Sequence, residues 1–266
     1  MKTNKQLQFI LTILVTFTIY FVLDELYFNT LRTWINSYIG IIGVSHIIAY
    51  VISLLPLITS AYMLHKTYKK NLESFGLDQS FLKGLAFCFI CTLPILLGYM
   101  IVFQFNSQIT LTRILINVIA AGVFEEIIFR GFLFGQLYRY TKLGFIPASF
   151  LGALLFGLVH LYQSDDPMTM LGIFVITFTG SLYFGWAYAE WKYNIWVPVF
   201  LHLLMNLYFE LFFAGENALG GLYMNIFRLL TMVLVIGLTL YYKRKNKLPF
   251  EINKKSWWMK KTLAQN

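Results

Sequence analysis

The stretch VFEEIIFRGFLFG, residues 123–135, places two adjacent glutamates and one arginine inside an apolar run. A charged group at the centre of a membrane helix costs about 2.5–3.5 kcal/mol, so these three side chains need partners or a wet cavity. Glu126 and Arg130 are four residues apart, which stacks them on one helical face and predicts an ion pair. Glu125 is rotated by about 100° from Glu126 and has no such local partner. The stretch predicts a membrane helix with a supporting pair and one free carboxylate.

The composition around this stretch is that of an integral membrane protein. Of the 266 residues, 58% are hydrophobic and only 12% are charged. Soluble domains have roughly 45–50% apolar and about 25% charged residues. Cys88 and Cys91 lie in an apolar run without a second cysteine pair, so we interpret them as packing residues rather than as a redox or metal motif. No soluble domain, linker or internal repeat is apparent.

Eight segments are long and apolar enough to predict spanning helices, since a span needs about 20 mostly apolar residues. They run over roughly 7–23, 39–64, 82–104, 110–138, 143–162, 168–189, 194–214 and 222–242. The first segment is followed by LDELYFNTLR and not by a small-residue cleavage site, so we expect it to be a retained helix. The predicted fold class is all-α, a polytopic membrane protein of about eight transmembrane helices around an intramembrane catalytic cavity, with residues 1–266 as one domain.

Basic residues in the predicted connections indicate the orientation of the chain. With eight spans, 17 of the 21 Lys and Arg residues fall on the side of both termini, and only Arg32 and Arg113 fall opposite. Asp24 and Glu25 are among the acids expected on that opposite side. Because Lys and Arg concentrate on the cytoplasmic side, we expect both termini to be cytoplasmic in a multi-pass cell-membrane protein. The basic tail, residues 243–261, favours anionic lipid as its partner rather than nucleic acid.

A second motif, FGLVH, places Phe156 and His160 four residues apart in the next predicted span. The turn between the two predicted helices lies near residues 141–143, which is midway in sequence between Glu125 and His160. In an antiparallel hairpin, residues equally far from the turn lie at the same depth, so we expect Glu125 and His160 at one depth. A carboxylate and an imidazole at the same depth are typical of a general base with its partner, or of a metal site.

A third motif, VPVFLHLLMN, places His202 and Asn206 four residues apart on one helical face. Both side chains can donate hydrogen bonds to a developing oxyanion. A lone membrane histidine is more often a packing residue with one hydrogen bond, so this reading depends on the other two motifs. Glu210 lies a further four residues along the same face, and we interpret it as a charge at the cavity rim.

Together the three motifs resemble the CAAX protease and bacteriocin-processing (CPBP) family of intramembrane endopeptidases, also called the Abi family. Its pattern E-E-x-x-x-R, F-x-x-x-H and H-x-x-x-N/D matches residues 125–130, 156–160 and 202–206 in order. The resemblance covers roughly residues 110–214, which would form a catalytic four-helix core. It implies peptide-bond hydrolysis at the membrane. Eukaryotic members remove the last three residues of prenylated CAAX proteins, and bacterial members resemble processors of bacteriocins or signalling peptides, or immunity proteins.

The resemblance implies a role for each motif residue. Glu125 would be the base, with His160 holding the same water. His202 and Asn206 would stabilise the oxyanion, and Glu126 with Arg130 would support the helix. The predicted site therefore comprises Glu125, His160, His202, Asn206, Glu126 and Arg130.

Several alternatives remain open at this point. Family members are often described as metalloproteases, and a divalent metal such as zinc would be held by Glu125, His160 and His202 if the reaction is metal-dependent. A metal-free reaction would use the same residues. The substrate would be a membrane-associated peptide or protein of a bacterial cell. A non-proteolytic membrane scaffold or immunity protein, or an ion-coupled transporter, is the alternative function.

Overall fold

The computed structural model describes residues 3–261, and this part of the chain contains helices and loops but no β-strand. The elements in chain order are α1 (Thr3–Ile39), α2 (Ile42–Ser53), α3 (Leu55–His65), α4 (Tyr68–Phe75), α5 (Phe81–Val102), α6 (Leu111–Arg113), η1 (Ile114–Glu125), η2 (Ile127–Phe134), α7 (Gly135–Tyr140), α8 (Phe145–Leu158), η3 (Leu161–Gln163), α9 (Pro167–Glu190), α10 (Trp196–Leu211) and α11 (Leu222–Lys245).

Six helices of the described chain are long and apolar enough to cross a membrane. They are Asn4–Ile39, Ile42–His65, Phe81–Val102, Phe145–Gln163, Pro167–Glu190 and Leu222–Lys245. The predicted all-α polytopic fold is therefore confirmed, whereas the predicted count of eight spans is not. The predicted segments 110–138 and 194–214 are not among these six. Residues 111–140 are divided among four short elements, and α10 has only 16 residues.

The first helix is longer than the sequence predicted. The expected span of residues 7–23 continues without interruption to Ile39, so the segment LDELYFNTLR is helical. No Gly or Pro breaks this stretch, and the helix ends only before Gly40, whose φ of +72° suits glycine. Asp24, which the sequence placed in a connection, lies within this helix, and its side of the membrane stays a prediction.

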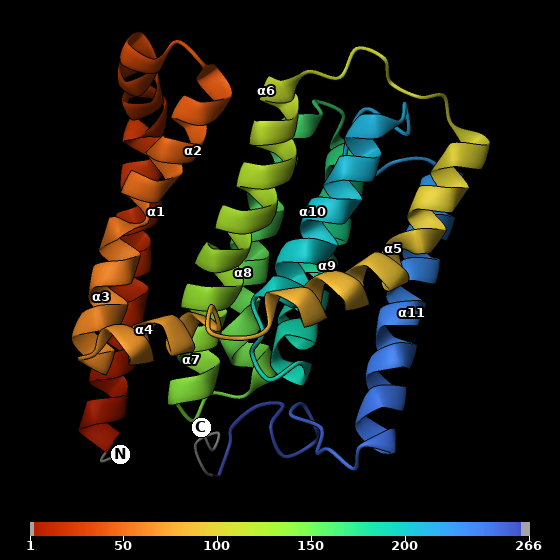
Figure 1. The fold of residues 1–266 in the computed structure, drawn as a ribbon. Helices are drawn as coiled ribbons and strands as arrows, with labels where there is room; N and C mark the ends of the chain where they lie inside the picture. Colours follow the sequence, from red (N-terminus) through yellow and green to blue (C-terminus); the bar gives the residue numbers. More distant parts are fainter. Residues whose placement is uncertain (1–2, 262–266) are drawn as a thin grey trace.

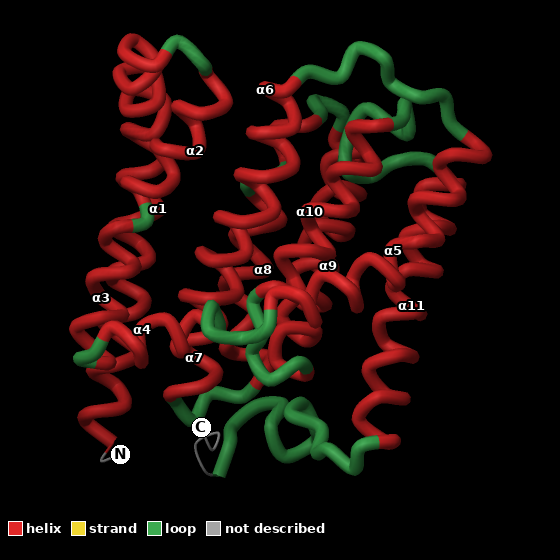
Figure 2. The backbone as a smooth tube through the Cα atoms, viewed as in Figure 1, coloured by secondary structure: helices red, strands yellow, loops and turns green. Residues whose placement is uncertain are grey.

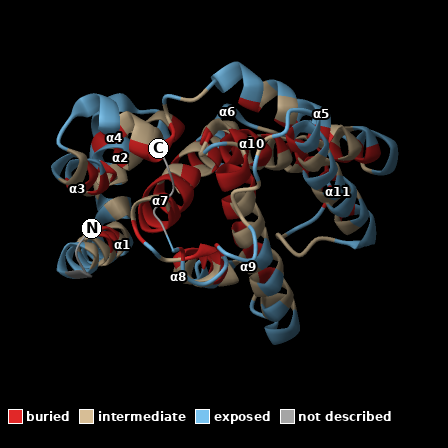
Figure 3. Cartoon of the chain, turned by 90° about the horizontal axis from the view of Figure 1, so that it is seen from below, coloured by how far each residue is buried: buried red, intermediate tan, exposed pale blue. Residues whose placement is uncertain are grey.

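The helices form a bundle with the motif-bearing elements at its centre. Helix α1 packs along α2 and α3 on one side, α5 packs with α11 on the other, and α10 packs between α5 and η1 (Figure 1). Seen from below, buried surface is concentrated on α7 and α10, whereas α1 and α11 carry much exposed surface at the edge (Figure 3). A membrane-facing periphery explains why these outer helices are apolar yet exposed.

The two ends of the described chain lie at the same end of the bundle, where α1 begins and the tail ends (Figure 1). After α11 the chain folds back beneath the bundle as a loop segment, residues 246–261 (Figure 2). The backbone N–H groups of Gly144, Phe145 and Ile146 donate to carbonyls of residues 256–258 over 2.7–2.9 Å. This segment therefore satisfies the N–H groups that the first turn of α8 leaves free.

Trp257 and Trp258 project from the folded-back segment, with 49% and 67% of their surfaces exposed. Indole rings suit the headgroup region, and Lys254 and Lys255 beside them are exposed as well. The preference of this segment for anionic lipid stays a prediction.

Candidate active site

The elements α6, η1, η2 and α7 follow one another almost without a break over residues 111–140, and we call this stretch the motif-bearing rod. The two glutamates lie where the rod has its widest turns. Residues Ile114–Glu125 and Ile127–Phe134 are π-helical, and Glu126 stands between the two elements. Such turns are rare and frequently occur at functional sites. Gly122 lets this rod approach α10 closely, because a Cβ atom there would lie 2.9 Å from the Cα of Leu203. The close approach brings the next motif, on α10, against the glutamates.

Glu126 joins two helices through one carboxylate oxygen. Its Oε1 accepts a hydrogen bond from Arg130 over 2.9 Å and another from Nδ1 of His202 over 2.8 Å. Glu126 is fully buried and Arg130 nearly so. The spacing predicted the pair with Arg130, but the contact with His202 was not foreseen. Glu126 thus fixes α10 to the rod as well as holding Arg130.

The contact with Glu126 determines how His202 can act. A carboxylate accepts hydrogen bonds, so Nδ1 of His202 carries the proton of this contact and Nε2 is left for another partner. The sequence placed His202 beside Asn206, or with Glu125 and His160 around a metal, but not against Glu126. The structure instead gives it a carboxylate that can balance an imidazolium charge. With His202 protonated, its charge and that of Arg130 would balance Glu125 and Glu126.

The ring of Phe156 connects the histidines with the arginine. The guanidinium of Arg130 lies 4.7 Å from the centre of Phe156 and 5.4 Å from that of Phe184. Ring centres of His160 and His202 lie 4.5 and 6.4 Å from that of Phe156. Cation–π contacts stabilise a desolvated guanidinium, which explains how Arg130 is buried with a single ion pair. The motif included Phe156 without a role, and nothing in the sequence marked Phe184.

His160 does not lie within a helix as predicted. Helix α8 ends at Leu158, and His160 occupies the turn that follows. Its Nδ1 donates to the carbonyl oxygen of Phe156 over 2.6 Å, which caps a free carbonyl at the end of α8. A carbonyl only accepts, so Nδ1 carries the proton and Nε2 is free to accept from a water.

Glu125 is half-buried, and its Oε2 atom has no hydrogen-bond partner. The carboxylate lies within electrostatic range of the phenol groups of Tyr20 and Tyr50 on α1 and α2. Across residues 3–261, no direct hydrogen bond joins Glu125 to His160. The Oε2 atom of Glu126 is also unpartnered, but its other oxygen is occupied twice. Glu125 is therefore the carboxylate with more freedom to meet a water or substrate.

Asn206 is partly occupied by a contact that the sequence did not indicate. Its Nδ2 atom donates to the backbone carbonyl of Asn117 over 2.8 Å, which leaves one amide N–H for other use. Glu210 was interpreted as a rim charge, but it is buried and accepts from Arg113 over 2.9 Å and from Asn117 over 2.7 Å. Asn117 thus orders this end of α10 through both contacts, and no spacing rule links it to either partner.

The predicted metal ligands do not form a ligand set in this arrangement. Within the part of the chain that the structure describes, no three His, Cys, Asp or Glu side chains come together so that they could hold a metal ion. One nitrogen of His202 is directed at Glu126 and one of His160 at a carbonyl. Both contacts use Nδ1 and leave Nε2 of each histidine free, as in histidines that bind a metal, so metal dependence stays a prediction.

Comparison with known proteins points to the same central region. Residues 107–208 match the family described as type II CAAX prenyl endopeptidase Rce1-like. A protein of Bacillus subtilis (strain 168) named "Putative membrane peptidase YdiL" is 38% identical over 95 residues. This alignment covers 36% of the chain and 34% of the relative, so it spans about a third of that protein. No solved structure matches the chain at a significant level.

Proposed function

We propose that this chain, whose residues 107–208 match the Rce1-like family, is a member of the CAAX protease and bacteriocin-processing family and an intramembrane endopeptidase that uses Glu125 as its general base. The observation that carries the proposal is the difference between the two glutamates. Oε1 of Glu126 is engaged by Arg130 and His202, whereas no side-chain hydrogen bond within residues 3–261 engages Glu125. A base must be free to accept a proton from water, and this arrangement leaves Glu125 for that role.

In the proposed reaction a water attacks the carbonyl carbon of a peptide bond in a membrane-associated substrate. Glu125 takes one proton from this water, and the free Nε2 of His160 accepts a hydrogen bond from its other O–H group. When the C–N bond breaks, Glu125 returns the proton to the leaving amine. One water is consumed and the base is regenerated, so no other reactant is required.

The tetrahedral intermediate carries a negative oxygen that needs donors. His202, protonated beside Glu126, would donate from Nε2, and the remaining amide N–H of Asn206 would donate alongside it. Both residues lie on one face of α10. Donors that are fixed before the reaction stabilise an oxyanion strongly in a site that excludes water. Glu126 and Arg130 would act by positioning His202 and not by touching the substrate.

Metal dependence stays a separate prediction. A bacteriocin-processing or CAAX-type substrate and a zinc-dependent reaction would both suit the family name, and the same residues would serve a metal-free reaction. Treatment with a strong chelator tests this point. Retained turnover after chelation, together with loss of turnover in Glu125→Gln, supports the metal-free reaction. Loss after chelation and recovery with added zinc would support a metalloprotease.

The direct test is mass spectrometry of membrane peptides from cells that express the wild-type chain or Glu125→Gln at equal protein levels. New cleavage products should depend on the wild-type chain, because glutamine keeps the size of glutamate but cannot accept the proton. Glu25→Gln, which changes an exposed acid on α1, serves as the matched control and should leave the products unchanged. Full activity of Glu125→Gln would end the proposal. Binding to a partner without any cleavage would favour the scaffold alternative.

A further inference from the structure

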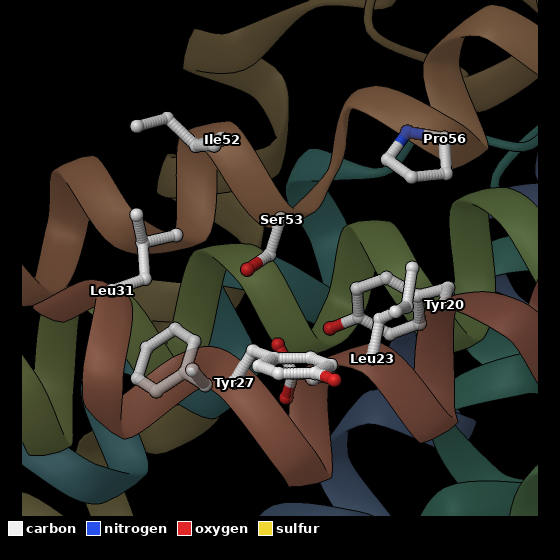
Figure 4. Close-up of a pocket in the computed structure, with 9 residues that line it drawn as sticks. Tyr20, Leu23, Tyr27, Leu31, Ile52, Ser53 and Pro56 are labelled. Carbon is white, nitrogen blue, oxygen red and sulfur yellow. The ribbon is translucent and has the colours of Figure 1, made fainter.

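A second polar site lies between α1 and the junction of α2 with α3. A cavity of about 220 Å³ is lined there by residues that include Tyr20, Asp24 and Ser53. The hydroxyl groups of Tyr20 and Ser53 point toward the same space, from different helices (Figure 4). Leu23 and Tyr27 at its edge are 44% and 58% exposed on the outside of the bundle. The cavity therefore opens sideways, toward the lipid that surrounds the helices.

The depth of this cavity makes Asp24 unusual. Ser53 lies halfway along the span Ile42–His65, and Asp24 lies inside the span Asn4–Ile39 beside it. An ionisable side chain far from both ends of a span is costly and marks a functional site by default. A residue that only packed here would be replaced by an apolar one without loss.

Asp24 has no charged partner within residues 3–261. Its Oδ1 atom is buried and accepts no hydrogen bond, and no ion pair includes it. The hydroxyls of Tyr20 and Ser53 stand beside the carboxylate, but hydroxyls carry no charge to balance it. A carboxylate in an apolar setting attracts a cation most strongly, because the interaction is weakly screened there.

One residue that lines the cavity, Tyr20, also lies within electrostatic range of Glu125. The phenol of Tyr20 lies within electrostatic range of both Asp24 and Glu125, and so does the phenol of Tyr50. The Tyr50 ring stacks on that of Phe124, the neighbour of Glu125, at 5.0 Å. Two phenols thus lie within electrostatic range of both carboxylates.

We propose that the cavity between α1 and the α2–α3 junction is a substrate subsite, in which Asp24 binds a protonated amine of the peptide. The amine would be a lysine side chain or a terminal ammonium group that enters sideways from the bilayer. Tyr20 and Ser53 complete its hydrogen bonding, and the rest of the peptide extends toward Glu125, which Tyr20 and Tyr50 both approach within electrostatic range. This subsite rests on the proposed proteolytic function.

Cation binding in the cavity can be measured without a known substrate. In Ser53→Cys the new thiol would react with methanethiosulfonate reagents that carry either an ethylammonium or a neutral hydroxyethyl group. Rates are measured on the purified full chain in nanodiscs and divided by the rates with a free thiol in solution. The native Cys88 and Cys91 are fully buried, and the unmodified chain gives their background. The cationic reagent should react about tenfold faster than the neutral one, as one nearby charge at low screening would cause.

Variants of Asp24 in the Ser53→Cys background decide the outcome. Asp24→Asn should remove the preference for the cation, and Asp24→Glu should retain it. Glu25→Gln alters an exposed acid on the outer side of the same helix and should change nothing. The same preference in Asp24→Asn, or no labelling by either reagent, would overturn the subsite.

The labelling result is independent of catalysis, so the two proposals can fail separately. Cation preference in a chain that cleaves nothing would refute only the proteolytic function. Cleavage that depends on Glu125, in a chain whose cavity shows no cation preference, would refute only the subsite. With both intact, Asp24→Asn should raise KM for a lysine-containing membrane peptide and leave KM for its glutamine counterpart nearly unchanged.

Discussion

Nδ1 of His202 and Oε1 of Glu126 lie 2.8 Å apart, which joins α10 to the junction of η1 and η2. The same oxygen accepts from Arg130, so one carboxylate holds an arginine of its own segment and a histidine of another helix. This contact separates the roles of two adjacent glutamates that look equivalent in sequence. It also predicts which variants should lose stability and which should lose turnover.

Glu126→Gln should reduce the amount of folded protein more than it reduces the turnover of each folded molecule. Removing one partner of a buried ion pair costs about 3–5 kcal/mol, because Arg130 would be left uncompensated. The expected result is low expression or a lower melting temperature in detergent. The double variant Glu126→Gln with His202→Asn should be less destabilised than the sum of the single variants, since the two residues share a contact. Simple additivity would contradict the contact.

His160→Ala should behave like Glu125→Gln and abolish most turnover while folding survives. The side chain caps one carbonyl at the end of α8, and the loss of such a bond costs only about 0.5–1.5 kcal/mol. His160→Asn offers a matched variant, because its amide can still donate to that carbonyl. If His160→Asn restored stability and full turnover together, the histidine would have a structural role only.

Asn206→Ala should leave measurable activity. Removing one oxyanion donor typically lowers kcat by about 10²–10³. The control is Asn117→Ala, which removes the contact with the Glu210 carboxylate but keeps the backbone carbonyl that accepts from Asn206. Its main effect should be on stability. Wild-type kcat in Asn206→Ala would exclude the assigned role.

Gly122→Ala should impair both folding and turnover, because the new methyl group would meet the backbone of Leu203 at 2.9 Å. Overpacking of this kind costs about 1–3 kcal/mol and would move α10 away from Glu126. Gly180→Ala on α9 is the matched control, since no atom lies within 4 Å of its new methyl group. That variant should be neutral or slightly more stable, and thermal unfolding of both purified variants gives the comparison.

Reporter fusions after Gly76 and Gly221 should lie on opposite sides of the membrane. Gly76 follows α4 at the end of the bundle where α1 begins, and Gly221 precedes α11 at the other end (Figure 1). The excess of Lys and Arg predicts that Gly76 is cytoplasmic. Paired alkaline phosphatase and fluorescent protein fusions report the two sides. The same side for both fusions would refute the topology.

The sequence predicted the helical membrane fold because apolar run length alone decides whether a segment can span a bilayer. It also placed Glu126 beside Arg130, since that contact depends only on local spacing. It could not give the bond from His202 to Glu126, because that bond depends on helix rotation, on the wide turns of η1 and on the close approach of α10 at Gly122, which local spacing does not determine. Roles for the remaining site residues stay predictions.

Two errors have a common physical origin. Asp24 was placed in a connection because scattered polar residues resemble one, whereas the helix continues until Gly40 breaks it. His160 was placed inside a helix because the apolar pattern continues past Leu158, although the backbone turns there and the imidazole caps it. Periodicity does not locate helix ends to within a few residues.

The bonds between residues 256–258 and the first turn of α8 have a consequence for the order of synthesis. Helix α8 leads to His160. The carbonyls of residues 256–258, which accept from the N–H groups at the start of α8, emerge from the ribosome only after α11. During translation the helix must enter the bilayer with those N–H groups bound to water or to lipid headgroups. The site would then be finished only when the end of the described chain arrives, which keeps the candidate site incomplete until after the last helix is made.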